Sequence, residues 1–293
     1  MSGSTTRGQH PKMRLPLIPL LIALASPMAA RSLPPPGGAA FAPARFSVET
    51  VGSGPDVILI PGLTSSRDVW RATVAAIPGY RYHLVQVAGF AGLPAGGNAR
   101  GEVLAPLAEE IARYIRAEKL DRPALVGHSM GGTLALMVAA RHPELVGKAM
   151  VVDMLPEPAA LVGARASGLG GLSDTLRDLA GTEVGRSLID SAIRLFGDDP
   201  RAKARSDPDV VARAIRELAV SDLTPELPRI RSPLTVVYAC PEPAVCAEID
   251  HSYAAAYAGD RSTRLVRMDG SGHMVMADQP ARFRAALRAF LAP

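Results

Sequence analysis

The sequence predicts an α/β fold, with a mostly parallel central sheet covered by helices on both faces. Short apolar runs alternate with stretches of helical spacing from residue 46 to the end of the chain, which is the pattern of successive β-α units. The run at residues 57–60 (VILI) is apolar throughout and ends at Pro61, as expected for a strand buried on both faces. Hydrophobic residues make up 48% of the 293-residue chain, and charged residues, at 20%, are spread along it. This composition supports a large folded core.

The α/β core is expected to comprise residues 45–154 and 229–293. Helical spacing is clearest where Val103, Leu107 and Ile111 recur on one face. Strands are expected at residues 46–51, 57–60, 82–87, 124–126, 149–152, 234–239 and 263–268. Helices are expected at residues 68–76, 102–118, 133–141 and 277–291.

Residues 155–228 interrupt this alternation. They show helical patterns at 172–179, 184–196 and 210–220, with no convincing strand. A helical insertion between two strands of such a sheet would cover the strand ends. We therefore expect residues 155–228 to form a helical cap, or lid, over the core.

The motif GHSMGG at residues 127–132 is the strongest chemical signal. Its G-x-S-x-G pattern directly follows a predicted strand and directly precedes the predicted helix that starts at Thr133, which is the setting of a nucleophile elbow. A serine on so sharp a turn has a strained backbone, and small neighbours avoid collisions. The turn aims the hydroxyl at a helix N-terminus, where backbone N–H groups favour developing negative charge. Ser129 is therefore the expected nucleophile.

The segment ALVGHSMGG at residues 124–132 resembles the elbow of the α/β-hydrolase superfamily, in the branch of small serine esterases, C–C hydrolases and cofactor-free haloperoxidases. The resemblance extends over most of residues 46–293. It implies an α/β-hydrolase fold with a helical cap inserted after the sixth strand, a catalytic histidine late in the chain, and neither a metal nor an organic cofactor. Haloalkane dehalogenases are disfavoured because their nucleophile is Asp, whereas this elbow holds Ser129.

A serine needs a base within hydrogen-bond reach, and His273 is the expected one. It stands in the loop DGSGH at residues 269–273, after the last predicted strand, and similar loops supply the base in the superfamily. His128 adjoins the nucleophile, and the geometry of the turn should direct it into a structural contact. The remaining histidines lie in the leader, in a strand or in helical stretches: His10, His83, His142 and His251.

The third member of the site should be a carboxylate that orients the imidazole. The chain order expected is Ser, acid, His, and relatives carry Asp after the strand predicted at 234–239. Here Glu242 is the only carboxylate near that strand end, so Glu242 is the expected acid. Asp153, directly after the strand at 149–152, is the main alternative, and Asp250 is a more distant one.

Two backbone N–H groups should stabilise the oxyanion. One is that of Met130, at the start of the helix after the nucleophile. The other is expected from the loop after residues 57–60, where relatives often have His-Gly in place of Pro61-Gly62, and Leu63 is our choice. Trp70, in the same loop region, is expected to belong to the core.

Cys240 and Cys246 are the only two cysteines in the chain. In an oxidising compartment they could form a disulfide that holds the loop carrying Glu242. The alternative is a pair of reduced, partly buried thiols. The spacing is not that of a redox C-x-x-C motif, and no further cysteine completes a zinc site.

The N-terminus has the layout of a secretory signal peptide over residues 1–30. Arg7, Lys12 and Arg14 precede a short, proline-containing apolar run. A flexible leader rich in Pro and Gly is expected at residues 31–44. We therefore expect a periplasmic or secreted protein without stable membrane insertion after cleavage. An uncleaved membrane anchor is the alternative.

The expected function is hydrolysis of a small, largely apolar carboxylic ester through an acyl-enzyme on Ser129. An amide or lactone hydrolase or a peptidase would use the same residues, and a binding protein that kept the fold without turnover is a further alternative. The net charge is +4, but the arginines are scattered, so the basic cluster of a nucleic-acid-binding protein is missing from the sequence. The expected partner is a small-molecule substrate, and the oligomeric state is left open.

Overall fold

The computed structural model describes residues 1–3, 41–162, 200–260 and 262–293. The chain divides into two units, Met1–Ala40 and Phe41–Pro293, and the second contains the helices and strands described below. The expected signal peptide and most of the leader fall outside the described residues, so export stays a prediction. Within the described ranges, no helix is both long enough and apolar enough to cross a membrane.

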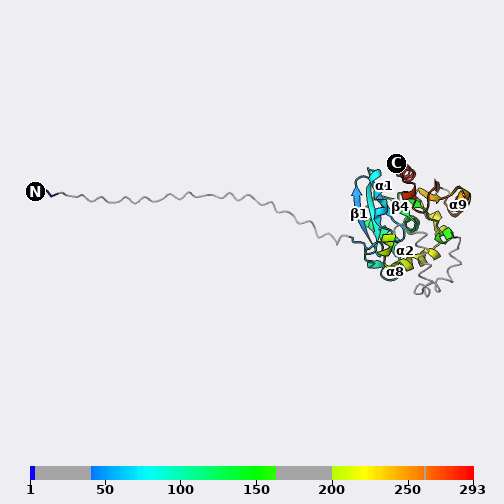
Figure 1. Cartoon of the computed structure of the whole chain (residues 1–293), viewed down its shortest axis with the longest axis horizontal. Helices are drawn as coiled ribbons and strands as arrows, with labels where there is room; N and C mark the ends of the chain where they lie inside the picture. The colour runs from blue at the N-terminus through cyan, green and yellow to red at the C-terminus, as the bar shows by residue number, and fades with distance from the viewer. Residues whose placement is uncertain (4–40, 163–199, 261) are drawn as a thin grey trace. The chain divides into compact units, whose positions relative to one another are not determined.

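A seven-stranded sheet forms the centre of the second unit, in the order β1-β3-β2-β4-β5-β6-β7 (Figure 1). The edge strand β1 pairs antiparallel with β3, and every other neighbouring pair is parallel. The strands are β1 (Phe46–Gly52), β2 (Asp56–Ile60), β3 (Arg81–Val87), β4 (Ala124–His128), β5 (Lys148–Val152), β6 (Leu234–Cys240) and β7 (Arg264–Asp269). The predicted fold class, a mostly parallel α/β sheet, is confirmed.

Helices cover both faces of the sheet. The sheet separates the interior into two apolar clusters, one on each face. In β2, Ile58 and Ile60 belong to one cluster and Val57 and Leu59 to the other, because successive side chains of a strand point to opposite faces. This explains why residues 57–60 of the strand are all apolar. The first cluster packs under α2 (Leu104–Ala117), α3 (Met130–Arg141), α8 (Pro208–Val220) and α9 (Pro243–Ala256). The second packs under α1 (Arg71–Ala76), α10 (Val275–Asp278) and α11 (Pro280–Leu291).

The expected cap region lies between β5 and β6. Its described parts are helical: η3 (Pro158–Val162), α7 (Pro200–Ala204), α8 and η4 (Thr224–Arg229). The helical patterns at 172–179 and 184–196 lie outside the described residues, so the cap at 155–228 stays a prediction. Five described strands precede this region, and its expected position after a sixth strand stays a prediction. Helix α8 is tied to the core where the Glu217 carboxylate accepts the N–H groups of Val103 and Leu104, at 2.9 and 2.7 Å.

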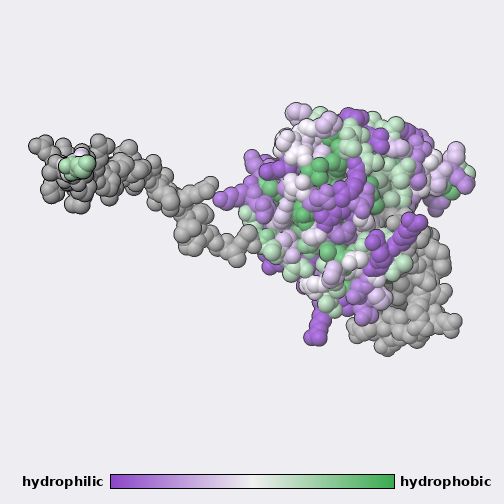
Figure 2. All heavy atoms as spheres, turned by 60° about the vertical axis from the view of Figure 1, so that its left-hand side comes forward, coloured by the Kyte–Doolittle hydropathy of each residue, from purple (hydrophilic) through white to green (hydrophobic). Residues whose placement is uncertain are grey.

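The surface of this unit shows no large apolar face in the view of Figure 2, where hydrophilic and hydrophobic residues are intermingled. Among its described residues, the large hydrophobic side chains that are exposed are Val220 and Val245. The large apolar side chains of the described part of this unit therefore lie mainly in the two internal clusters.

Candidate active site

Ser129 occupies a sharp turn between β4 and α3. Its backbone has φ 53° and ψ −124°, a conformation that L-residues other than glycine rarely adopt. The turn is held from both sides, because the Ser129 N–H donates to the carbonyl of Val152 at 2.9 Å and the Ser129 carbonyl accepts from Gly132 N at 2.7 Å. Ser129 thus stands at the carboxyl end of the sheet and at the N-terminus of α3. It is buried, with 1% of its surface exposed.

The glycines around Ser129 are required by close backbone packing. A Cβ atom on Gly127 would lie 2.0 Å from the carbonyl oxygen of Gly131, and one on Gly131 would lie 2.3 Å from the carbonyl oxygen of Ile60. A Cβ atom on Gly132 would come within 3.0 Å of a methyl carbon of Val151. The spacing of the motif therefore reflects how closely α3 approaches β2, β4 and β5.

Asp153 is the carboxylate that the structure pairs with His273. It follows β5 directly, with φ 51°, and is 7% exposed. Its Oδ2 accepts from His273 Nδ1 at 2.7 Å. Its Oδ1 accepts from the backbone N–H of Ala239 at 2.8 Å and from the hydroxyl of Tyr253 at 3.1 Å. Because a carboxylate can only accept, this arrangement fixes the Nδ1-protonated tautomer of His273.

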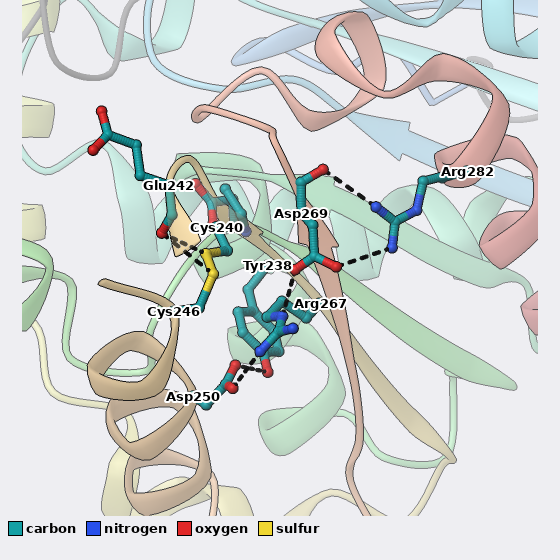
Figure 3. Close-up of a disulfide and its surroundings, with 10 residues drawn as sticks. Tyr238, Cys240, Glu242, Cys246, Asp250, Arg267, Asp269 and Arg282 are labelled. Carbon is teal, nitrogen blue, oxygen red and sulfur yellow. Dashed lines mark hydrogen bonds and ion pairs between the residues drawn. A yellow bond between two sulfur atoms is a disulfide. The ribbon is translucent and has the colours of Figure 1, made fainter. Parts of the chain in front are cut away.

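The structure does not bring Glu242 to the imidazole, so the expected pairing of Glu242 with His273 is corrected to Asp153. Glu242 is exposed, and Figure 3 shows its carboxylate pointing away from the neighbouring disulfide. The physical reason is local: the chain leaves β6 and enters α9 at Pro243, which turns the Glu242 side chain outward.

The loop that carries His273 is held by backbone contacts. Gly270 N donates to the carbonyl of Cys240 at 2.7 Å, which fixes the loop to the end of β6. His128 Nε2 donates to the backbone carbonyl of His273 at 2.9 Å, and the centroids of the two imidazole rings lie 4.7 Å apart. The expected structural role of His128 is confirmed, because this side chain connects the turn of Ser129 to the loop of His273.

The other described histidines have partners elsewhere or lie at the surface. His83 Nε2 contacts Asp56 at 2.8 Å, and His142 Nε2 contacts Glu109 at 3.0 Å. His251 is exposed on α9. His128 and His273 contact each other at the carboxyl end of the sheet, beside the turn of Ser129, and His273 also contacts Asp153 there.

The loop after β2 passes directly beside the turn of Ser129. A Cβ atom on Gly62 would lie 3.1 Å from Ser129 Cβ. Leu63 and Met130, the expected oxyanion donors, are both buried, at 1% and 0% exposure. The two segments are thus adjacent, and their oxyanion role stays a prediction. Trp70 is fully buried in the second apolar cluster, as expected for a core residue.

Cys240 and Cys246 form a disulfide with a Cα–Cα distance of 5.4 Å. It joins the end of β6 to the first turn of α9, and Figure 3 shows it beside the ion pairs of Arg267 with Asp250 and Asp269, both at 2.6 Å. The two sulfurs and an Asp269 oxygen lie within 4.8 Å of one another. Sulfurs bonded to each other cannot act as thiolate ligands, so this group does not fit a metal ion.

A strained serine between a strand and a helix, a paired imidazole and carboxylate, and a mostly parallel sheet with helices on both faces are the features of an α/β-hydrolase. The model of the alpha/beta hydrolase family matches residues 57–286, which is more than half of the chain. The chain belongs to the alpha/beta hydrolase family.

Curated relatives and solved structures agree with this assignment. The pimeloyl-[acyl-carrier protein] methyl ester esterase of Aeromonas hydrophila subsp. hydrophila is 36% identical over 111 residues, 38% of this chain and 42% of that protein, so the match spans less than half of its length. The protein of the same name from Vibrio atlanticus is 27% identical over 203 residues, 64% of this chain and 76% of that one.

Two solved structures show the same fold. The enol-lactonase from Burkholderia xenovorans LB400 has a TM-score of 0.59 at 18% identity, over 84% of this chain and 96% of that one. A hydrolase from Pseudomonas aeruginosa PA01 has a TM-score of 0.61 at 19% identity, over 85% of this chain and 94% of that one.

Replacing Gly131 by alanine should displace α3 from the sheet. The new Cβ would collide with the backbone oxygens of Ile60 and Pro61, at 2.3 and 2.7 Å, and backbone cannot move aside as a side chain can. We expect a loss of about 3 kcal/mol in the free energy of unfolding, measured by urea denaturation. The matched control is Gly259→Ala, whose Cβ would make only ordinary contacts, the nearest at 3.6 Å. Equal stability of the two variants would contradict the packing argument.

Proposed function

We propose that this protein is a serine hydrolase that cleaves a small, largely apolar carboxylic ester through an acyl-enzyme on Ser129. His273 acts as the base and Asp153 as the acid that orients it. The observation that carries the proposal is the 2.7 Å hydrogen bond between His273 Nδ1 and Asp153 Oδ2. Asp153 directly follows Val152, whose carbonyl accepts the Ser129 N–H, so acid and nucleophile stand on neighbouring strand ends.

The chemistry follows from this arrangement. Protonation of His273 on Nδ1 leaves the Nε2 lone pair to take the hydroxyl proton as Ser129 Oγ attacks the substrate carbonyl. Asp153 stabilises the resulting imidazolium. The tetrahedral oxyanion is held by the N–H groups of Leu63 and Met130, each worth about 3 kcal/mol in the transition state. His273 then protonates the leaving alcohol, and a water activated by His273 releases the acid and restores Ser129.

An ester is the proposed substrate because an alkoxide leaves more readily than an amine. Two curated relatives are named as methyl ester esterases, which supports the same class of bond. The apolar character of the acyl or alcohol part is proposed from the Ala- and Leu-rich sequence of residues 155–228. Lactones and amides would be cleaved by the same three side chains, so a panel of matched esters, lactones and anilides distinguishes these substrates.

Ser129 should react covalently with a fluorophosphonate probe, and Ser129→Ala should not. The reaction requires an activated hydroxyl, so selective loss of labelling in this variant would identify the nucleophile. Labelling is followed by intact-protein mass analysis, and ester hydrolysis by alcohol release. If wild type and variant label equally, or if neither labels, the serine hydrolase proposal is wrong, and a binding protein of the same fold becomes the better account.

Asp153→Asn should lower kcat by about 10³- to 10⁴-fold, because an amide at this position no longer selects the productive tautomer of His273. The matched variant Glu242→Gln makes the same chemical change at an exposed position, and we expect its kcat to stay within about twofold of wild type. Circular dichroism confirms that both variants are folded. A large loss in Glu242→Gln with an active Asp153→Asn would return the acid to Glu242.

A further inference from the structure

One face of α9 is attached to the sheet at four successive positions. Cys246, Asp250, Tyr253 and Tyr257 are spaced three and four residues apart and therefore lie on the same side of the helix. Cys246 is bonded to Cys240 at the end of β6. Asp250 accepts from the Tyr238 hydroxyl at 2.7 Å. Tyr253 and Tyr257 contact the segment that follows β5, which carries Asp153.

Tyr253 is the member of this face that contacts the carboxylate. Its hydroxyl lies 3.1 Å from Asp153 Oδ1. The side chain is buried at 3% exposure, and its ring stacks on Tyr238 with centroids 4.4 Å apart. Burial first, and the nearby charge of Asp153 second, raise the pKa of Tyr253 well above its ordinary value. The hydroxyl therefore keeps its proton and donates.

Tyr257 provides a close structural comparison. It caps the C-terminal end of α9, one turn beyond Tyr253, and is 2% exposed. Its ring is nearly parallel to that of Tyr253, with centroids 6.4 Å apart. Its hydroxyl donates to the backbone carbonyl of Met154 at 2.7 Å. Each tyrosine thus makes one buried hydrogen bond, but only that of Tyr253 goes to the carboxylate.

We infer that Tyr253 is a positioning residue for the proposed hydrolase site, which acts through Asp153 on the hydrogen bond between Asp153 and His273. With Ala239 N–H and the Tyr253 hydroxyl on Oδ1, the carboxylate has a fixed orientation, and Oδ2 is directed at the imidazole. The disulfide sets α9 on the end of β6, two turns before Tyr253. This inference rests on the proposed function for its effect on turnover, but not for its effect on the hydrogen bond.

The physical consequence has a definite direction. A carboxylate that receives fewer donors concentrates its negative charge and accepts more strongly from the donors that remain. Removing the Tyr253 hydroxyl should therefore strengthen the hydrogen bond from His273 Nδ1–H while loosening the orientation of the carboxylate. The stronger hydrogen bond should be visible in the proton resonance of His273 Nδ1–H. The looser carboxylate should lower the rate of the proposed reaction.

The test is Tyr253→Phe, with Tyr257→Phe as the matched control. In ¹⁵N-histidine-labelled protein, the low-field proton resonance of His273 Nδ1–H is assigned by its loss in His273→Gln. We expect it to move further downfield in Tyr253→Phe and to keep its wild-type position in Tyr257→Phe. We also expect kcat to fall roughly fivefold in Tyr253→Phe, with KM little changed, because a hydrogen bond to a charged group is lost.

The control separates a positioning role from a structural one. Both variants lose a buried hydrogen bond and should lose similar unfolding free energy, so a drop in stability alone does not distinguish them. If the resonance of Tyr253→Phe stays at the wild-type position, the inference is overturned, whatever the kinetics show. If the resonance moves although wild-type protein fails to label at Ser129, the positioning contact stands and the proposed hydrolase function fails.

Discussion

The carboxylate of Asp153 connects the end of β5 to three contacts that lie 86, 100 and 120 positions later in the chain. It extends from the end of β5, receives a backbone N–H from β6 and a hydroxyl from α9, and accepts from His273, 120 positions later. Without this carboxylate, the loop of His273 would be attached mainly by the contacts of its own backbone. Every chemical role proposed for the site depends on the contact between Asp153 and His273, because an imidazole takes a proton efficiently only when its tautomer and orientation are fixed.

Two strained residues stand at this point of the fold. Ser129 and Asp153 have φ values of 53° and 51°, and such conformations cost about 1–3 kcal/mol each in non-glycine residues. Both follow parallel strands that are paired with each other, and their backbone N–H groups are used: Ser129 N donates to Val152, and Asp153 N donates to Val237 at 2.7 Å. The buried strands thus hold both residues in conformations that a free loop would leave.

The sequence predicted the sheet well because its strands have strong local signals. The apolar run of β2, the elbow motif after β4 and the glycine-rich loop after β7 each contain their own pattern, and the structure places Ser129 and His273 in the expected turn and loop. The carboxylate that contacts His273 was harder to predict, because its identity depends on which strands are neighbours and on where a helix starts. Glu242 follows the expected strand, but entry into α9 turns it outward, whereas Asp153 follows β5, the strand next to β4 and the turn of Ser129. Tyr253 has no local signal beyond its helical spacing.

The most direct test of the account is a crystal structure of the protein after reaction with a fluorophosphonate. We expect phosphorus bonded to Ser129 Oγ, a phosphonyl oxygen within hydrogen-bond distance of the Leu63 and Met130 N–H groups, and His273 Nδ1 still paired with Asp153. An adduct on another residue, or an imidazole turned from Asp153 toward Glu242, would contradict it.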